Sequence, residues 1–253
     1  MASRDTSPDR RAVFERDDST CQLCGVDVDP EDATAYPIGP VDLEAAHPSR
    51  TATICESCLE RVRGEAGEPT TSVAVFRTVR RITRTQGATV ADAADFASQA
   101  TSFPETLTAD TVPPYAADRR RLLLAIEAVE TDLETLEAAD RSELKAGARV
   151  SLEDFTAVSK ELQTGLESIL ELISLAAVAF GRCHVCFEVL EDGRADCQAC
   201  GAEIDSLEEW RGTDGSVRFD ALFGEISDVL VEASETTEEV ARRTTVLAET
   251  LVE

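Results

Sequence analysis

Cysteine spacing is the strongest constraint on what this chain can fold into. All eight cysteines fall into four Cys-x-x-Cys pairs, at positions 21/24, 55/58, 183/186 and 197/200. Two such pairs supply the four thiolates of one tetrahedral site, and pairing by proximity along the chain leaves no cysteine over. The sequence therefore predicts two structural zinc sites, the first formed by Cys21, Cys24, Cys55 and Cys58 and the second by Cys183, Cys186, Cys197 and Cys200.

The charge balance of the chain is strongly acidic. Its 253 residues include 50 acidic side chains against 24 lysines and arginines, a formal net charge of −26, and only Lys145 and Lys160 are lysines. Self-repulsion of this size destabilises a compact chain unless salt screens it, and near molar ionic strength the screening length is about 3 Å. The composition resembles that of proteins from extreme halophiles. In such a protein, local clusters of arginine say more about anionic partners than the net charge does.

Targeting and membrane signals are not visible in the sequence. No apolar run follows the charged residues at the amino terminus, and the most apolar segment, at 169–180, contains Glu171 and is too short to span a bilayer. We therefore expect a soluble, cytoplasmic protein that has no membrane partner. Cysteines stay reduced in that compartment, which favours metal binding over disulfides.

Long amphipathic helices are expected between and after the cysteine pairs. Apolar residues recur at heptad-like spacing in three segments, about 118–138, 152–180 and 219–252. Ser151 is placed to cap the second segment. The polar stretch between the first two segments is short, which predicts an antiparallel helical hairpin over 115–181.

Proline content and local charge divide the chain further. Residues 101–115 carry three prolines, which is typical of a linker. The expected units are residues 1–66 around the first cysteine set, 67–114 as a basic helix followed by the linker, 115–181 as the hairpin, 182–212 around the second cysteine set, and 213–253 as a carboxy-terminal amphipathic helix.

An ordered pattern surrounds the first cysteine set. A helix near residue 10 leads through Arg16-Asp17 into the knuckle CQLCG at 21–25, and the segments LEAAH at 43–47 and ICESC at 54–58 follow. Glycine after the knuckle tolerates the backbone that turns N–H groups toward sulfur. Over residues 10–63, this pattern resembles the zinc-containing branch of the HNH endonuclease family. The resemblance implies a ββα treble clef in which a strand-end histidine activates water beside a divalent metal ion.

The resemblance gives His47 the position of the general base. The other catalytic positions hold different residues: Ala46 precedes the histidine, Arg50 stands where the family has asparagine, and Leu59 follows the last cysteine. Alanine and leucine offer no ligand to a hard cation, so Mg²⁺ or Mn²⁺ is expected only if the site is active. Alternatively, His47 is a structural histidine at a strand end, has an accessory role at the zinc site, or contacts phosphate. Nearby carboxylates that could replace the missing ligands are Asp42, Glu44, Glu56 and Glu60.

Four arginines follow the first cysteine set in the segment VFRTVRRITR at 75–84. On a helix, Arg77, Arg80, Arg81 and Arg84 lie within an arc of about 100°, opposite the apolar residues. One interpretation is phosphate contact with nucleic acid. The other is pairing with the protein's own acidic helix at 122–138, through Glu127, Glu130 and Glu134.

The second cysteine set has the spacing of a zinc ribbon. Ten residues separate its two pairs, and Asp192-Gly193 suits the turn of a hairpin between them. Zinc is the expected ion, with iron as the alternative. His184 lies inside the first knuckle, where we expect its side chain to point outward. Ribbons bind nucleic acid, bind protein or join helix ends, and the flanking helices here favour the last role.

The sequence thus predicts a mainly helical protein that carries two small zinc modules. The expected function is that of an HNH-endonuclease-like zinc-binding protein acting on or near DNA, with phosphodiester cleavage left open. The alternative is a non-enzymatic scaffold, in which two zinc sites staple helices whose apolar seams bind a protein partner or form a homodimer.

Overall fold

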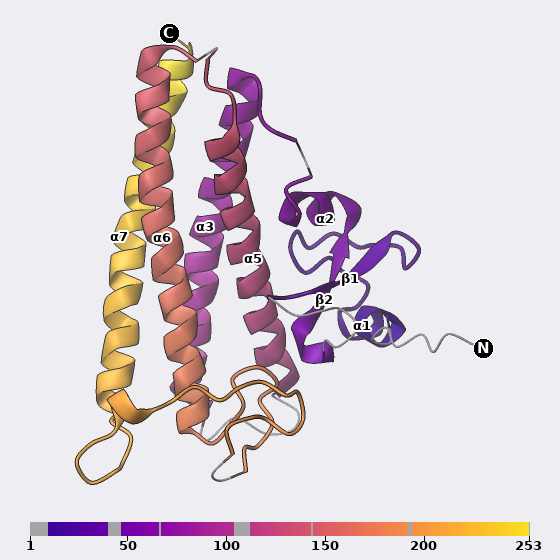
Figure 1. Ribbon diagram of the computed structural model, residues 1–253, viewed down its shortest axis with the longest axis vertical. Helices are drawn as coiled ribbons and strands as arrows, with labels where there is room; N and C mark the ends of the chain where they lie inside the picture. The colour runs from indigo at the N-terminus through magenta and orange to yellow at the C-terminus, as the bar shows by residue number, and fades with distance from the viewer. Residues whose placement is uncertain are drawn as a thin grey trace.

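Four long helices make up the main body of the protein. The computed structural model describes residues 10–39, 47–65, 67–103, 112–142, 144–191 and 194–252. The long helices are α3 (Ser72–Ala100), α5 (Val112–Ala138), α6 (Ala146–Ala179) and α7 (Phe219–Val252). Consecutive helices run in opposite directions and pack into an up-down-up-down bundle (Figure 1). The mainly helical fold expected from the sequence is confirmed.

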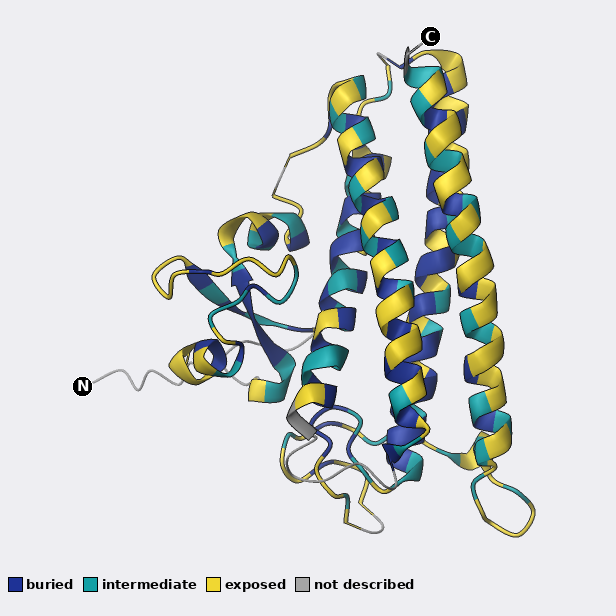
Figure 2. Ribbon diagram, turned by 180° about the vertical axis from the view of Figure 1, so that it is seen from behind, coloured by how far each residue is buried: buried dark blue, intermediate teal, exposed yellow. Residues whose placement is uncertain are grey.

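The core of the bundle follows the apolar periodicity of its helices. Figure 2 shows the buried faces of the long helices turned toward one another and their exposed faces turned outward. Two buried glutamines add polar links between helices. Gln86 Nε2 on α3 donates to the backbone oxygen of Ser159 at 2.7 Å, and Gln163 Nε2 on α6 donates to that of Ile126 at 2.6 Å. Such satisfied polar groups favour one register among the helices.

Two helix boundaries differ from the sequence prediction. Helix α6 begins at Ala146, with Lys145 as its N-cap, so Ser151 is buried inside the helix and does not cap it. Helix α3 continues well past the four arginines to Ala100, and the rest of its length packs in the bundle. Of the proline-rich stretch at 101–115, residues 104–111 lie outside the described residues, and α5 already begins at Val112.

An amino-terminal unit, formed by the described residues among 10–65, packs on the flank of the bundle beside α5 (Figure 1). It contains α1 (Arg10–Arg16), β1 (Ala33–Pro37), the 3-10 turn η2 (Pro48–Arg50), β2 (Thr51–Cys55) and α2 (Glu56–Val62). The two strands pair antiparallel, from Ala33 opposite Cys55 to Pro37 opposite Thr51. Phe14 and Ile54 of the unit share an apolar cluster with Ala128 of α5, so its core is continuous with that helix.

A connecting unit, formed by the described residues among 180–218, joins the end of α6 to the start of α7 at one end of the bundle (Figure 1). It contains the second cysteine set and the short turn η3 (Glu208–Trp210). Phe187 anchors the unit, because its ring lies 5.9 Å from that of Phe103 and 6.4 Å from that of Tyr115. The predicted turn at Asp192-Gly193 lies outside the described residues.

Among the described helices, α6 is the one that is long and apolar enough to cross a membrane. Its most apolar 18-residue window has a mean hydropathy of 1.4, but 56% of that window is buried inside the protein. This burial fits a core helix of a soluble bundle, since a membrane span would turn its apolar face to lipid.

Candidate metal centres

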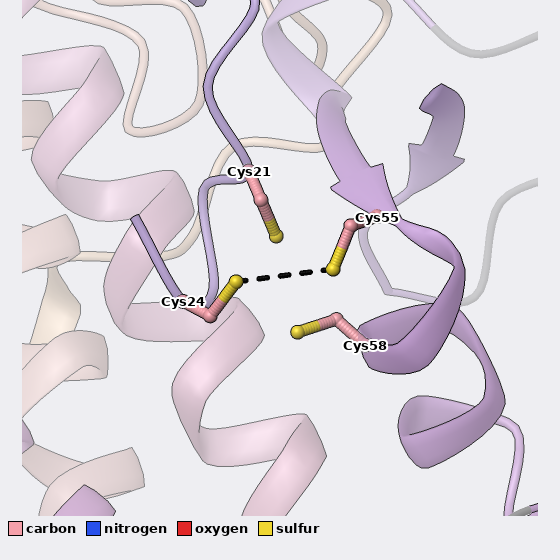
Figure 3. A group of neighbouring side chains, drawn as sticks. All are labelled: Cys21, Cys24, Cys55 and Cys58. Carbon is pink, nitrogen blue, oxygen red and sulfur yellow. Dashed lines mark hydrogen bonds between the residues drawn. The ribbon is translucent and has the colours of Figure 1, made fainter. Parts of the chain in front are cut away.

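The four cysteines of the first pairing meet in the amino-terminal unit (Figure 3). Cys21 and Cys24 lie on a knuckle closed by the bridge between Thr20 and Asp27, Cys55 ends β2, and Cys58 lies in the first turn of α2. Their sulfur atoms all lie within 4.8 Å of one another. Cys21 is fully buried and Cys24 is exposed, so the site faces solvent on one side.

The Arg16-Asp17 pair holds the knuckle against β2. Asp17 accepts two bonds from Arg16, at 2.7 and 2.9 Å, and one from the backbone nitrogen of Thr53 at 2.8 Å. The guanidinium of Arg16 also donates to the backbone oxygen of Thr51 at 2.7 Å. These bonds satisfy a carboxylate with only 1% of its side chain exposed, and they fix where β2 delivers Cys55.

The second cysteine set consists of two knuckles that face each other in the connecting unit. The bridge between Arg182 and Val189 closes the first knuckle, and the bridge between Asp196 and Glu203 closes the second. Its sulfur atoms also lie within 4.8 Å of one another. Cys183, Cys186 and Cys197 are buried, and the backbone nitrogen of Val185 donates to the Cys183 sulfur at 3.4 Å.

The residue after each knuckle has a left-handed backbone. This residue is Gly25 in the first set, where φ is +73°, and Gly201 in the second, where φ is +68°. Phe187 follows the first knuckle of the second set and has a φ of +60°. This conformation costs an L-residue about 1 to 2 kcal/mol. Its ring is 1% exposed, so packing against the bundle offsets the strain and couples this knuckle to the helices.

Both sets fit a single tetrahedral metal ion. Four sulfurs at about 2.3 Å from a central zinc lie about 3.8 Å apart. The observed separations are 3.8 Å between Cys24 and Cys55, 3.6 Å between Cys183 and Cys200, and 3.6 Å between Cys186 and Cys197. The structure therefore contains two tetracysteine sites with the geometry of a structural metal centre.

The acidities of neighbouring sulfurs differ strongly within each set. A hydrogen bond with Cys58 lowers the pKa of Cys21 to about 4, and the same contact raises the pKa of Cys58. In the second set, Cys186 lowers the pKa of Cys183 to about 4, and its own pKa rises. Without a metal ion, each set thus favours one thiolate that accepts hydrogen bonds from the neighbouring thiols. A bound dication would let the remaining thiols ionise as well.

His47 belongs to neither cysteine set. Its Nδ1 lies 2.7 Å from the hydroxyl of Ser49 and accepts from the backbone nitrogen of Ser49 at 3.2 Å, so the ring caps η2. Burial lowers its pKa. Ala46, Asp42 and Glu44 lie outside the described residues, while Leu59 packs with the apolar residues of the unit.

The four predicted arginines lie on α3 but have different surroundings. Arg81 pairs with Asp132 of α5, through contacts of 3.0 and 2.6 Å, and Asp132 also binds Arg61 of α2. Internal pairing is therefore correct for Arg81, although its partner is none of the three predicted glutamates. Arg77, Arg80 and Arg84 are exposed and form no ion pair within the described part of the chain. Arg80 lies over the ring of Phe76 at 5.9 Å.

Some polar residues acquire importance only in the folded chain. Arg50, Arg119, Arg120 and His184 line one cavity between the amino-terminal unit, α5 and the connecting unit. The expectation that His184 points outward is wrong, since only 12% of its side chain is exposed. The sequence does contain one indication of these buried arginines, the run Arg119-Arg120-Arg121. Three consecutive side chains point in different directions around a helix, so they cannot all face water when the helix packs against the rest of the protein.

Comparisons of the chain with protein-family models, curated proteins and solved structures found no match. Functional inference therefore rests on the geometry of the chain's own residues.

Proposed function

We propose that this chain is a zinc-binding protein that holds nucleic acid through its phosphate backbone on an HNH-like scaffold, without cutting it. The observation that carries the proposal is the exposed arginine row Arg77, Arg80 and Arg84. These cations stay free of ion pairs among the described residues of a chain with 50 acidic side chains. Arg84 and Cys21 line the same surface cavity, so the row runs up to the first metal centre.

The scaffold part of the proposal is supported by the order of elements around the first cysteine set. A helix, a knuckle, two antiparallel strands and a short helix follow one another, which is the order that the resemblance implies for a treble clef. The two facing knuckles of the second set fit a zinc ribbon. Four thiolates in a tetrahedron favour zinc over hard cations such as Mg²⁺, with iron as the competing ion.

The surroundings of His47 support binding without cleavage. Its Nδ1 is engaged by Ser49, and two other positions of the family's catalytic pattern hold Arg50 and the apolar Leu59. Plasmid incubated with the protein in Mg²⁺ or Mn²⁺ at high salt should stay supercoiled, with wild type and His47→Ala alike. Cleavage that requires His47 would overturn this part of the proposal.

The spacing of the arginine row suits a phosphate backbone. Seven residues of helix separate Arg77 from Arg84, a rise of about 10 Å, and phosphates follow every 3.4 Å or so along one DNA strand. Three phosphate contacts would give a slope of about −2.7 for the logarithm of the binding constant against the logarithm of salt concentration. Phosphate contacts position a nucleic acid without reading its sequence, so the binding should be weakly sequence dependent.

The test is fluorescence anisotropy with duplex DNA over a series of KCl concentrations. Changing Arg77, Arg80 and Arg84 together to Gln should flatten the salt slope by about 2.7 and abolish binding at the higher concentrations. A matched control replaces three exposed arginines elsewhere, Arg149, Arg194 and Arg242, and should keep the slope of wild type. Equal loss in both variants would assign the effect to net charge and reject the arginine row.

A non-enzymatic scaffold is the second candidate function. It is favoured by Asp132, which ties Arg61 of the amino-terminal unit and Arg81 of α3 to α5. In that case the metal centres and this ion cluster serve only to hold a helical surface for a protein partner. DNA binding with the predicted salt slope would exclude this alternative as the whole function.

A further inference from the structure

The cavity between the three parts of the protein is basic, although the chain as a whole is acidic. It has a volume of about 300 Å³, and its walls come from the amino-terminal unit, from the first turns of α5 and from the first knuckle of the connecting unit. Arg50, Arg119 and Arg120 all line it, and no described carboxylate does. The cavity has room for several water-sized groups, since one water occupies about 30 Å³ in the liquid.

Arg120 has unused hydrogen-bonding capacity inside the protein. Only 4% of its surface is exposed, and its buried Nε has no hydrogen-bond partner in the described structure. Its ion pair with Asp17 is long, at 3.6 Å, because Asp17 already accepts from Arg16 and from Thr53. Burial lowers the pKa of Arg120 to about 10, so the side chain still carries its charge at neutral pH.

Arg119 is half-buried, and it forms no hydrogen bond or ion pair with the described residues. Its pKa is lowered to about 10, chiefly by burial and also by the charge of Arg50, while Cys183, Asp205 and Cys200 act in the opposite direction. Four thiolates around one dication would leave a formal negative charge on the second metal centre, which stabilises the Arg119 cation without occupying its N–H donors. Arg119 thus pays a desolvation cost that the described side chains offset only in part.

His184 completes the polar wall of the cavity. Its Nδ1 is buried and has no hydrogen-bond partner in the described chain, and the nearest carboxylate oxygen, on Asp205, is 3.9 Å away. The described residues that line the cavity include no carboxylate, although Asp205 lies beside His184 and Asp17 pairs with Arg120 from outside the cavity. Guanidinium groups with free N–H donors match the oxygens of a tetrahedral oxyanion, and phosphate is the commonest such group.

We propose that the cavity lined by Arg50, Arg119, Arg120 and His184 binds a phosphate group. The bound anion would join the amino-terminal unit, α5 and the connecting unit, because each of the three contributes a donor. This site is separate from Arg77, Arg80 and Arg84 on α3, and it does not depend on DNA binding there. The phosphate could come from free inorganic phosphate or from the terminal phosphate of a nucleic acid, and the chemistry of recognition is the same.

Isothermal titration of the full zinc-loaded chain with inorganic phosphate, in KCl that maintains its circular dichroism spectrum, tests the site. Wild type should bind phosphate saturably at one site. Arg119→Gln should bind at least tenfold more weakly, because a hydrogen bond between charged groups is lost. Arg149→Gln removes an equal charge at an exposed position outside both the cavity and the arginine row, and should bind like wild type.

Two further measurements keep the test decisive. Arg120→Gln also removes a partner of Asp17 and could unfold the amino-terminal unit, so Arg50→Gln serves as the second cavity variant and should weaken binding in the same way. A short oligonucleotide with a 5′-phosphate should compete with inorganic phosphate if nucleic-acid ends are the source, and its unphosphorylated form should not. Competition by neither oligonucleotide would assign the site to free phosphate. The proposal is refuted if wild type shows no saturable phosphate binding, or if Arg119→Gln and Arg50→Gln bind as wild type does.

Discussion

Asp132 joins three elements of the fold, so its removal should be costly. The carboxylate is 4% exposed and binds Arg61 of α2 at 2.7 Å and Arg81 of α3 at 2.6 Å. Asp132→Asn keeps the shape of the side chain but leaves two guanidinium groups without a counter-charge. Removing one partner of a buried ion pair costs about 3 to 5 kcal/mol. Because 41% of the Arg81 side chain is exposed and water can hydrate it, we expect the lower end, about 3 kcal/mol.

Urea unfolding followed by circular dichroism measures this loss, since urea is uncharged and leaves the ionic strength unchanged. Asp154→Asn is the matched control, because Asp154 pairs with Arg243 at 2.9 Å on the surface and 48% of its side chain is exposed. That change should cost less than about 1 kcal/mol. The Asp132 loss should also be similar at about 2 and 4 M KCl, because salt screens buried pairs poorly.

A triple replacement separates the uncompensated charge from lost packing. Changing Asp132 to Leu together with Arg61 and Arg81 to Met removes all three charges at similar volume, and should leave stability within about 1 kcal/mol of wild type. The reasoning is refuted if Asp132→Asn costs no more than Asp154→Asn, or if the triple replacement is as destabilised as the single one.

Three further predictions concern the connecting unit and Glu127 of α5, which accepts a hydrogen bond from Tyr36 of β1. Cys197→Ser should reduce the zinc content from two ions per chain to one by elemental analysis, and retention of both ions would contradict the second site. Phe187→Gly relieves a positive φ worth about 1 kcal/mol but loses a buried ring worth about 3 to 5, so urea unfolding should show a net loss of about 2 to 4 kcal/mol. Gly201→Ala, with open space around the added methyl group, should lose only about 1 kcal/mol, and an equal loss in both would refute the anchoring role of Phe187. Burial raises the pKa of Glu127, so the folded chain holds this proton to higher pH than the unfolded chain does, and stability should fall as pH rises from about 4.5 through the raised pKa. A pH series of unfolding should show that this fall is absent in Glu127→Gln; an unchanged slope would contradict it.

The metal centres could be predicted because the cysteine spacing that forms them lies within short stretches of sequence. A Cys-x-x-Cys pair places two sulfurs on one turn, so only the pairing of pairs had to be inferred, and the nearest pairs in sequence do meet. The role of Arg16-Asp17 was also visible as a motif, although its bonds to β2 are seen only in the fold.

Helices with large apolar side chains were easier to predict than the second half of α3. The seam residues Leu122, Leu133 and Leu136 of α5 are all buried, as their heptad spacing indicates. Beyond Arg84, α3 packs largely through small and polar residues such as Ala93, Thr89 and Gln86, which carry a weak periodic signal. Ser151 was misassigned as a cap, because residues 146–150 continue the helix without any change in apolar pattern.

The arginine cavity could not be predicted from the sequence. Its residues come from three segments separated by more than sixty positions, and only packing brings Arg50, Arg119 and His184 to one place. Sequence periodicity reports which face of a helix is apolar, and it does not report which distant loop covers a polar residue at the end of that face.

The placement of the second metal centre between α6 and α7 makes the metal a reversible crosslink in the chain. With the ion bound, Cys183 and Cys200 are held together and the flexible length between the two helices is shortened, which lowers the entropy cost of bringing them into register. The coupling is reciprocal, so the packing of α6 against α7 strengthens metal binding by the same free energy by which bound metal strengthens that packing. The metal affinity of this site therefore reports on how well α6 and α7 pack. A change in α7 far from any cysteine should alter that affinity, and removal of the metal should weaken the packing along the whole length of the two helices.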